Sequence, residues 1–326
     1  MKIAVTGASG HIGAALVREL MTRGHAVRAL VHRNMRGLEA LPVEKVEGDL
    51  RAGDSLRRAF AGAEIVIHAA GRISVARTGI RRLLETNLGG TENVIAACRA
   101  AGVRRLVHFS SVEALSSAPL DLPVDEDRPL REVDARAPYS SSKAEGERAV
   151  RRAVDAGLDA VILYPTAVIG PFDFAPSMLG SALLALARGS IPVLVDGGFD
   201  WVDVRDVAAG AVSAAEGAGR GARYLLGGRW ASLVELAALA CRATGARAPR
   251  LVCPTALARA WAPVSAVLSS LVGGAPVFTG YTLETLNGNR RVSHARAERD
   301  LGYRARDLGE TVEDTCRWFR ENGFLP

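Results

Sequence analysis

Several features that would assign a protein to a special class are missing from this sequence of 326 residues. It has no run of about 18 apolar residues, so it lacks the pattern of a helix that inserts into a membrane. Its first residues, Met1–Val5, have the composition of a strand rather than that of a secretion signal. The four cysteines lie far apart without a Cys-x-x-Cys pair, which indicates neither disulfides nor a metal site. We therefore expect a cytoplasmic protein without metal and without membrane insertion.

Lysine is scarce as well, since it occurs only at positions 2, 45 and 143. The net charge of +6 and the isoelectric point near 9.5 come from arginines scattered over predicted helices among glutamates. Such a pattern is typical of a solvated surface, and no basic run with interleaved aromatic residues is present. We therefore expect a small-molecule substrate and no nucleic-acid partner, although a basic cleft for cofactor phosphates remains compatible with the charge.

Short runs rich in β-branched residues alternate with amphipathic stretches in the first half of the chain. The predicted strands are 2–5, 26–31, 43–47, 65–68, 105–110 and 159–164, and the predicted helices between them are 12–22, 54–61, 87–101 and 139–156. Crossovers of this length join parallel strands with a right-handed connection. The sequence therefore predicts an α/β fold of the Rossmann type, a doubly wound parallel sheet with helices on both faces.

The pattern changes after Pro165, where glycine and proline become frequent. Further on, the predicted elements are a helix over 202–215, a strand over 223–226 and helices over 232–244 and 310–322. We expect a nucleotide-binding domain of residues 1–170, to which 199–228 return, and a smaller C-terminal substrate-binding domain of residues 171–198 and 229–326. The apolar segment 255–277 either packs in the core or forms a lid over the substrate.

A glycine-rich turn joins the first predicted strand directly to the first predicted helix. Gly7 permits the tight turn, Gly10 lets the backbone approach a pyrophosphate, and Gly13 lets the helix pack closely on the sheet. The N–H groups and the dipole at the helix N-terminus favour the negative charge of a phosphate. This turn therefore predicts the binding of a nicotinamide dinucleotide. The residues expected to contact it here are Gly7, Ser9, Gly10, His11, Ile12 and Gly13.

The end of the second predicted strand lacks the acidic residue that binds the ribose 2′-OH in NAD-preferring enzymes. His32 and Arg33 stand there instead and would meet a 2′-phosphate. The sequence therefore predicts a preference for NADP(H), with NAD(H) as the alternative. Asp49 ends the third strand where it could hydrogen-bond the adenine. The remaining residues expected along the cofactor are Leu50, Ala69, Ala70 and Gly71.

Tyr139 and Lys143 lie four residues apart, on one face of a predicted helix. We expect Lys143 and a positively charged nicotinamide ring to lower the pKa of the Tyr139 phenol, so that it exchanges a proton with a carbonyl or alcohol oxygen. Lys143 would also hold the nicotinamide ribose. Ser110 and Ser111 end the preceding strand at the same edge of the sheet, where either hydroxyl could bond the same substrate oxygen.

Together these motifs resemble those of the extended short-chain dehydrogenases/reductases, in the NAD-dependent epimerase/dehydratase superfamily. The segments that carry the resemblance are 6–13, 49–50, 68–71, 87–91, 109–111, 139–143, 165–171, 202–207 and 301–303. It covers essentially the whole chain and is strongest to the dihydroflavonol-reductase and 3β-hydroxysteroid-dehydrogenase branch. Members of that branch act on carbonyls or secondary alcohols of hydrophobic molecules.

The resemblance implies a catalytic triad of Ser111, Tyr139 and Lys143, of which the last two also contact the cofactor. It implies that Pro165 and Val168 line the nicotinamide. In one respect the chain departs from the branch: the arginine that such reductases carry after the second strand aligns with His32, and an arginine follows one residue later. Related folds often form a homodimer through two helices of the sheet layer.

Two other functions remain open at this point. Nucleotide-sugar epimerases and dehydratases resemble this chain, but they carry an asparagine where it has Thr166. The dehydratases also follow the catalytic hydroxyl with an Asp–Glu pair, of which only Glu113 is present, so that this residue could serve as an extra acid or base. A non-enzymatic NADP(H) sensor would typically lose Tyr139 or Lys143, and both are present. We therefore expect a simple oxidoreductase.

Overall fold

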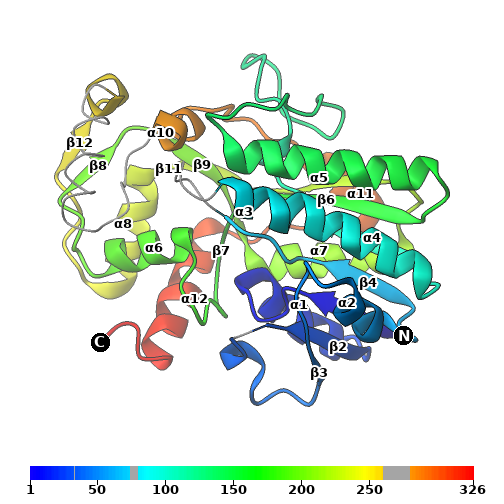
Figure 1. Cartoon of the computed structure of the whole chain (residues 1–326). Coiled ribbons are helices and arrows are strands. Elements are labelled where there is room, and N and C mark those ends of the chain that lie inside the picture. Colours follow the sequence, from blue (N-terminus) through cyan, green and yellow to red (C-terminus); the bar gives the residue numbers. More distant parts are fainter. Residues whose placement is uncertain (33, 74–79, 260–279) are drawn as a thin grey trace.

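The computed structural model describes residues 1–32, 34–73, 80–259 and 280–326 (Figure 1). Arg33 and the part of the apolar segment beyond Arg259 lie outside these residues, so the structure describes neither the expected 2′-phosphate contact of Arg33 nor whether the apolar segment packs in the core or forms a lid. Among the described residues, no helix is both long and apolar enough to cross a membrane.

A seven-stranded parallel sheet forms the centre of the molecule. Its strands lie in the order β10-β6-β5-β4-β1-β2-β3. Their bounds are β1 Lys2–Thr6, β2 Ala26–Val31, β3 Glu44–Glu47, β4 Ile65–His68, β5 Arg105–Phe109, β6 Ala160–Pro165 and β10 Arg223–Leu226. The order reverses at β1, so β2 and β4 flank it on opposite sides. In such a sheet the crevice beyond the carboxyl ends of the strands at this reversal is the place where a ligand binds.

Helices cover both faces of this sheet, which confirms the predicted doubly wound α/β fold (Figure 1). One buried cluster joins the sheet to α1 (His11–Thr22) and α7 (Val204–Gly217). The other joins it to α2 (Gly53–Phe60), α4 (Gly90–Ala100) and α5 (Pro138–Asp155). Strands buried on both faces are mostly apolar along their whole length, and this explains why β4 and β6 contain continuous apolar runs.

The helix predicted over 202–215 begins two residues later than expected. Val202 and Asp203 end a strand, β9 (Gly198–Asp203), and Val202 pairs with Val168 of β7 (Ala167–Ile169). The Asp203 carboxylate then accepts the backbone N–H of Arg205 at 2.7 Å and caps α7 at its first turn. The aspartate therefore sets the boundary that hydrophobic periodicity alone places too early.

The helix predicted over 87–101 is longer and is not regular. It comprises α3 (Ile80–Leu84), a π-helical turn η2 (Glu85–Gly89) and α4. A π turn inserts one residue into the helical repeat and rotates the side chains that follow, and such turns often occur at functional sites. Asn87 lies inside this turn.

The chain after β6 contributes a third buried cluster and a small fourth one. Their elements are β7, β9 and β11 (Arg229–Ser232) in one small sheet, β8 (Val193–Val195) and β12 (Leu251–Cys253) in another, and the helices α6 (Met178–Ala187), α8 (Leu233–Thr244), α10 (Gly280–Leu286) and α12 (Leu308–Glu321). The helix α11 (Ala295–Leu301) packs instead with α7 and β10, and its buried Ala297 belongs to the cluster of α1 and α7. In the returning segment 199–228, α7 and β10 pack with the large sheet, whereas β9 belongs to the small one.

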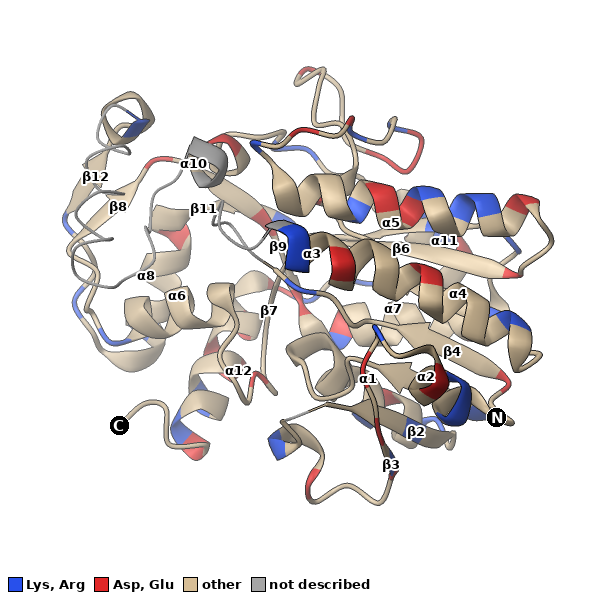
Figure 2. Cartoon of the chain, viewed as in Figure 1, with Lys and Arg blue, Asp and Glu red and all other residues tan. Residues whose placement is uncertain are grey.

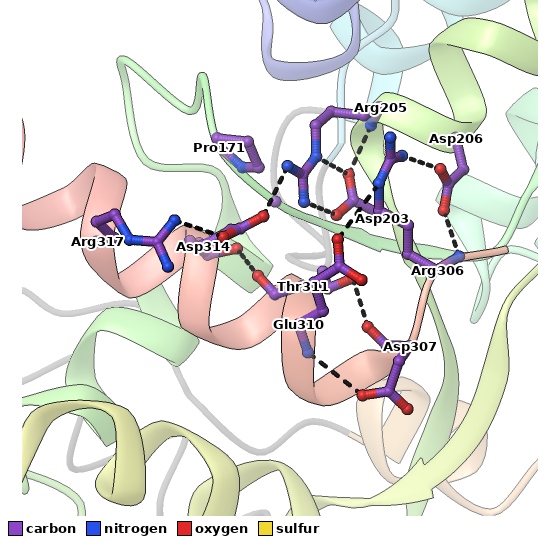
Figure 3. A network of polar contacts seen from close by, with 12 residues as sticks. Pro171, Asp203, Arg205, Asp206, Arg306, Asp307, Glu310, Thr311, Asp314 and Arg317 are labelled. Carbon is purple, nitrogen blue, oxygen red and sulfur yellow. Dashed lines mark hydrogen bonds and ion pairs between the residues drawn. The ribbon is translucent and has the colours of Figure 1, made fainter.

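A network of ion pairs fastens α7 to α12 (Figure 3). Arg205 pairs with Asp203 at 2.6 Å and with Asp314 of α12 at 2.7 Å. Arg306, just before α12, pairs with Asp206 and donates its backbone N–H to the same carboxylate at 2.7 Å. These contacts connect α7, which packs on the large sheet, with α12.

Candidate active site

The glycine turn has the close contacts that its sequence predicts. Gly7 has a φ of +70°, and a Cβ there would lie 2.6 Å from the backbone nitrogen of Ala70. A Cβ on Gly13 would collide with the carbonyl oxygen of Gly7, so the start of α1 packs in direct contact with the turn. α1 has neither a side-chain N-cap nor an acidic residue in its first turn. Its N-terminal N–H groups and positive dipole end therefore suit an anion such as a pyrophosphate.

His11 is placed at this turn, but its ring faces the protein. The Nε2 atom donates to the carbonyl oxygens of Gly170 (3.2 Å) and Pro171 (3.0 Å), in the loop after β7. Burial lowers the pKa of His11, while the nearby Asp173 carboxylate opposes this. Of the other expected residues, Ser9 is half-buried on the turn and Ile12 packs against the core. His11 therefore ties the glycine turn to the C-terminal elements.

At the end of the sheet expected to hold the adenosine, a histidine lies beside an ion pair. The His32 ring is about half exposed, with its Nε2 atom 3.6 Å from the Asp49 carboxylate. Asp49 forms a two-armed ion pair with Arg51, at 2.6 and 3.1 Å, and this pairing lowers its pKa to about 2. The carboxylate that we expected to bind adenine is thus held by Arg51, a residue that we did not single out. Leu50 is buried next to Gly90 of α4.

Small residues lie between the glycine turn and the helix α5. Ala69 and Ala70 follow β4, and their backbone N–H groups donate to Thr6 at 3.2 and 3.4 Å. A Cβ on Gly71 would lie 3.5 Å from the Lys143 ammonium. Gly71 therefore leaves free the space directly beside Lys143, where the resemblance places the ribose of the cofactor.

Tyr139 and Ser111 come together at the carboxyl edge of the sheet. Tyr139 lies in the first turn of α5, and Ser111 follows β5 and is 7 % exposed. Burial raises the pKa of the Tyr139 phenol to about 12, a hydrogen bond with Ser111 lowers it, and the Glu113 carboxylate raises it further. Glu113 also accepts a hydrogen bond from the Ser140 hydroxyl at 3.1 Å. Ser111 and Glu113 thus act on the phenol, and Ser140 bonds the Glu113 carboxylate.

Lys143 lies one helical turn after Tyr139 and is half-buried. Its ammonium donates to the carbonyl oxygen of Phe109 at 2.7 Å, and burial lowers its pKa to about 8. For the pKa of the Tyr139 phenol, burial and the Glu113 carboxylate outweigh the hydrogen bond with Ser111.

The two serines after β5 have different surroundings. Ser110 donates to the fully buried carboxylate of Glu147 at 2.6 Å, and the same carboxylate accepts from Tyr164 at 2.6 Å and from Arg151 at 2.7 Å. The Ser110 hydroxyl is therefore hydrogen-bonded inside the protein, whereas the Ser111 hydroxyl contacts Tyr139. We did not anticipate Glu147, although it follows Lys143 by one helical turn on the same face of α5.

Asn87 is a second residue whose position the sequence analysis did not explain. Its side-chain amide donates to the Ser142 hydroxyl and to the carbonyl oxygen of Arg72, both at 2.9 Å, and it accepts the Arg72 N–H at 2.7 Å. The π turn places it between α5 and the chain after β4. The irregular helix therefore positions a side chain that bridges α5 and the segment after β4.

Pro165 and Val168, the residues expected beside the nicotinamide, follow each other along the same edge. Pro165 ends β6 opposite Leu226 of β10, and Val168 is half-buried in β7. Thr166 lies between them with a buried hydroxyl. Among the described residues, no cluster of three or more His, Cys, Asp or Glu side chains could hold a metal ion.

Comparison with known proteins places the chain in a family. The NAD dependent epimerase/dehydratase family matches residues 3–227, more than half of the chain, and the chain belongs to it. Within that family it is similar to sterol demethylase protein B of Methylococcus capsulatus, with 34% identity over 100% of both chains. It is also similar to a Synechocystis sp. protein provisionally named a dihydroflavonol 4-reductase, with 32% identity over 98% of this chain and 95% of the other.

A solved structure gives the same result. The crystal structure of gox2253 superposes with a TM-score of 0.88, shares 32% sequence identity and covers 99% of both chains. The expected resemblance to the extended short-chain dehydrogenases/reductases is confirmed, including relatives named for the dihydroflavonol-reductase and 3β-hydroxysteroid-dehydrogenase branch. The chain is thus an NAD(P)-dependent enzyme of this family.

Proposed function

We propose that this enzyme is an NADP(H)-dependent oxidoreductase that reduces a ketone or aldehyde of a hydrophobic molecule, or oxidises the corresponding secondary alcohol. The observation that carries the proposal is the meeting of Ser111 and Tyr139 at the edge of the sheet, with Lys143 facing the gap beside Gly71. Both relatives described above are named for polycyclic, largely apolar molecules, a sterol and a dihydroflavonol. Their names support a substrate of that chemical class.

The arrangement suits a nicotinamide dinucleotide that runs from the glycine turn to Lys143. When bound, the dinucleotide supplies or accepts a hydride. Tyr139 would donate its proton to the carbonyl oxygen of the substrate, and Ser111 would donate a hydrogen bond to the same oxygen and orient it. Lys143 would hold the ribose hydroxyls from its position beside Gly71. In alcohol oxidation, Tyr139 would act in the reverse sense, as the base that takes the hydroxyl proton.

The charges around the second and third strands favour NADP(H) over NAD(H). The half-exposed His32 ring stands where an NAD-preferring enzyme would present an acid, and the nearby Asp49 carboxylate is neutralised by Arg51. Arg33 follows His32 in the sequence and adds a guanidinium group next to it. A 2′-phosphate would therefore meet a net positive surface. We expect Arg33→Ala to weaken the binding of NADPH far more than that of NADH.

The main alternative is a nucleotide-sugar epimerase or dehydratase, because the family contains both. Thr166 stands in place of the asparagine of those enzymes, and its hydroxyl is buried in the protein. Glu113, the single carboxylate of the expected pair, accepts a hydrogen bond from Ser140 and lies beside the Tyr139 phenol. These observations favour simple hydride transfer over sugar chemistry, and the presence of both Tyr139 and Lys143 opposes a non-enzymatic sensor.

A homodimer through α4 and α5 is the assembly that we propose. These two helices leave between them a surface groove of about 340 Å³. It is lined by small residues and by charges of both signs: Glu92, Ile95, Ala96, Arg99, Ala149, Arg152, Ala153 and Ala156. Alanines permit close approach of a second helix pair, and a two-fold axis would bring each acidic side chain near the basic ones of the partner.

The test is the oxidation of NADPH and NADH in the presence of hydrophobic ketones, aldehydes, acyl thioesters and nucleotide sugars. We expect turnover with a hydrophobic carbonyl and a preference for NADPH. Tyr139→Phe should reduce the rate by roughly 10²- to 10⁴-fold with little change in NADPH affinity, whereas the matched control Tyr224→Phe, on β10, should keep it. Equal turnover in Tyr139→Phe, or activity with nucleotide sugars alone, would refute the proposal.

A further inference from the structure

The two-stranded ribbon of β8 and β12 exposes apolar side chains at one end of the molecule. Leu251 is 63% exposed and Val252 46%, and Val193, the cross-strand partner of Leu251, is 38% exposed. Leu257, on the helical turn after β12, is 56% exposed. In Figure 1 this ribbon lies at the end of the molecule far from the N-terminus. Proteins usually charge or cover an edge of this kind, so a bare apolar edge indicates a contact surface.

The inner side of the same ribbon is firmly packed. Leu194 is buried in the C-terminal core, and Val195 is buried against Ala258, Leu283 and Leu286. The exposed residues are therefore held by a fixed scaffold. Leu194 and Val195 therefore anchor the ribbon, whose apolar side chains are exposed in the part of the chain that the structure describes.

The charge of the sequence segment that contains β12 is of one sign. Between Glu235 and Glu284 the sequence contains no acidic residue but four arginines. Three of them, Arg247, Arg250 and Arg259, are exposed and flank β12 and the turn that follows it. Figure 2 shows the charged segments next to β12 in blue, in contrast to the mixed charges along α4 and α5. The one acid at the ribbon, Asp196, lies beyond the covered end of β8.

We propose that the β8–β12 ribbon docks the enzyme on an anionic lipid surface. The apolar side chains of Leu251, Val252 and Leu257 would enter the interface between headgroups and acyl chains, while the flanking arginines contact anionic headgroups. A protein partner or a second copy would need acidic groups opposite these arginines, and the ribbon itself offers only Asp196. A bilayer with anionic lipids supplies both the apolar layer and the negative charge.

This docking is independent of the identity of the substrate, but it fits the proposed chemistry. A hydrophobic carbonyl compound is concentrated in the bilayer, so an enzyme held at the lipid surface would meet it there. The cofactor edge is built from other elements, which leaves the binding of NADPH unaffected by contact through the ribbon. Docking can therefore be measured without any substrate.

The experiment is sedimentation of the full chain with vesicles of phosphatidylcholine, with or without about 30% phosphatidylglycerol. We expect binding to the anionic vesicles, weakened by salt, and little binding to neutral ones. Leu251→Asp should reduce the bound fraction at least tenfold, and Arg250→Glu several-fold. The matched controls are Leu120→Asp, at a side chain that is 59% exposed on another loop, and Arg57→Glu on α2. Both controls should bind as the unchanged protein does.

Each other outcome would overturn the proposal. Absence of binding at low salt excludes a lipid surface, and equal losses in the Leu120 and Leu251 variants indicate adsorption without a defined face. If Leu251→Asp changes the molar mass in solution instead, the ribbon is an interface between copies of the chain. Because Arg250→Glu alters only an exposed side chain, it tests the proposal even if Leu251→Asp disturbs folding. Turnover of a water-soluble ketone serves as the independent check on the active site.

Discussion

At the scale of single residues, the proposed reaction depends most on the phenol of Tyr139. Burial raises its pKa to about 12, which suits the proposed proton donor in carbonyl reduction at neutral pH. Alcohol oxidation would require the phenolate, which the Glu113 carboxylate disfavours. The pH dependence of each proposed direction therefore depends on the charges that surround one hydroxyl.

Glu113→Gln should shift the pH dependence of alcohol oxidation to lower pH. The amide keeps an acceptor for the Ser140 hydroxyl but removes the negative charge that raises the pKa of Tyr139. Below that pKa, each unit of the shift raises the phenolate fraction about tenfold. The measurement is kcat/KM for a secondary alcohol across the pH range. A profile that stays in place or moves to higher pH would show that Glu113 does not act on the phenol.

Ser110 and Ser111 provide a matched pair of variants. Ser111→Ala removes the hydroxyl that bonds Tyr139, so kcat should fall by roughly 10²-fold with little change in stability. Ser110→Ala leaves the buried Glu147 carboxylate with one donor fewer, which should cost about 1–3 kcal/mol of stability while kcat stays nearly unchanged. Thermal unfolding and initial rates separate the two effects, and the reverse pattern would exchange the roles of the serines.

The sequence predicted those parts of the candidate site in which a type of residue serves one common purpose at a fixed spacing. Gly7 and Gly13 have the close contacts expected of them, and Ser111 and Tyr139 meet as expected. The contributions of Arg51 and Glu147 could not be predicted in this way, because arginine and glutamate are common on helices and loops. Only the tertiary structure places them next to Asp49 and Ser110.

At the scale of elements, neighbouring strands bring two buried histidines together at the centre of the sheet. His68 of β4 is the cross-strand partner of His108 of β5, with ring centroids 5.4 Å apart. His68 bonds Thr6 at 2.7 Å and Thr91 at 3.2 Å, whereas neither ring nitrogen of His108 has a partner among the described residues. Burial lowers the pKa of His68 to about 3 and that of His108 well below its usual value.

These shifts predict that acid destabilises the fold. An unfolded chain protonates both histidines as the pH falls below about 6.5, whereas the folded chain protonates them only at much lower pH. The free energy of unfolding should therefore decrease as the pH falls below about 6.5, with a contribution of up to about 1.4 kcal/mol per pH unit from each histidine. His108→Leu should remove the contribution of one histidine to this slope. It should also stabilise the protein by about 1 kcal/mol at pH 7, because it removes an unpartnered polar ring.

Urea unfolding at several pH values measures both effects. Comparison with the unchanged protein at each pH separates the change in slope from the change in stability at pH 7. A loss of stability at pH 7 in His108→Leu would mean that the ring has a structural contact that apolar packing cannot replace.

Among the helices and strands, hydrophobic periodicity predicted the long elements and missed the short ones. The strands and helices of the large sheet were predicted to within a residue or two in most cases, since each is a regular segment buried along one face or both. The short strands β8, β11 and β12 escaped prediction because three or four residues contain too little periodicity. The start of α7 was placed wrongly because Asp203, a capping residue, interrupts a continuous apolar pattern.

At the scale of the whole molecule, the exposed groove between α4 and α5 leads to a prediction about assembly. The proposed two-fold contact requires small side chains along the groove, and Ala96 and Ala156 lie on its exposed rim. Ala96→Arg should therefore convert a dimer into a monomer of 34.4 kDa. Ala182→Arg, at an exposed alanine of α6, is the matched control and should remain dimeric. Light scattering after gel filtration gives the molar mass of each variant.

The same measurement tests whether assembly affects the active site. Tyr139 and Lys143 lie at the start of α5, and the groove is formed by the middle and end of the same helix and by α4. Packing of a second copy would thus fix the helix that holds both catalytic groups. The monomeric variant should retain the fold, because the substituted alanine is exposed, but should bind NADPH more weakly. A monomer with unchanged affinity would show that α5 is held in place by the sheet alone, and a native chain that is already monomeric would exclude the dimer.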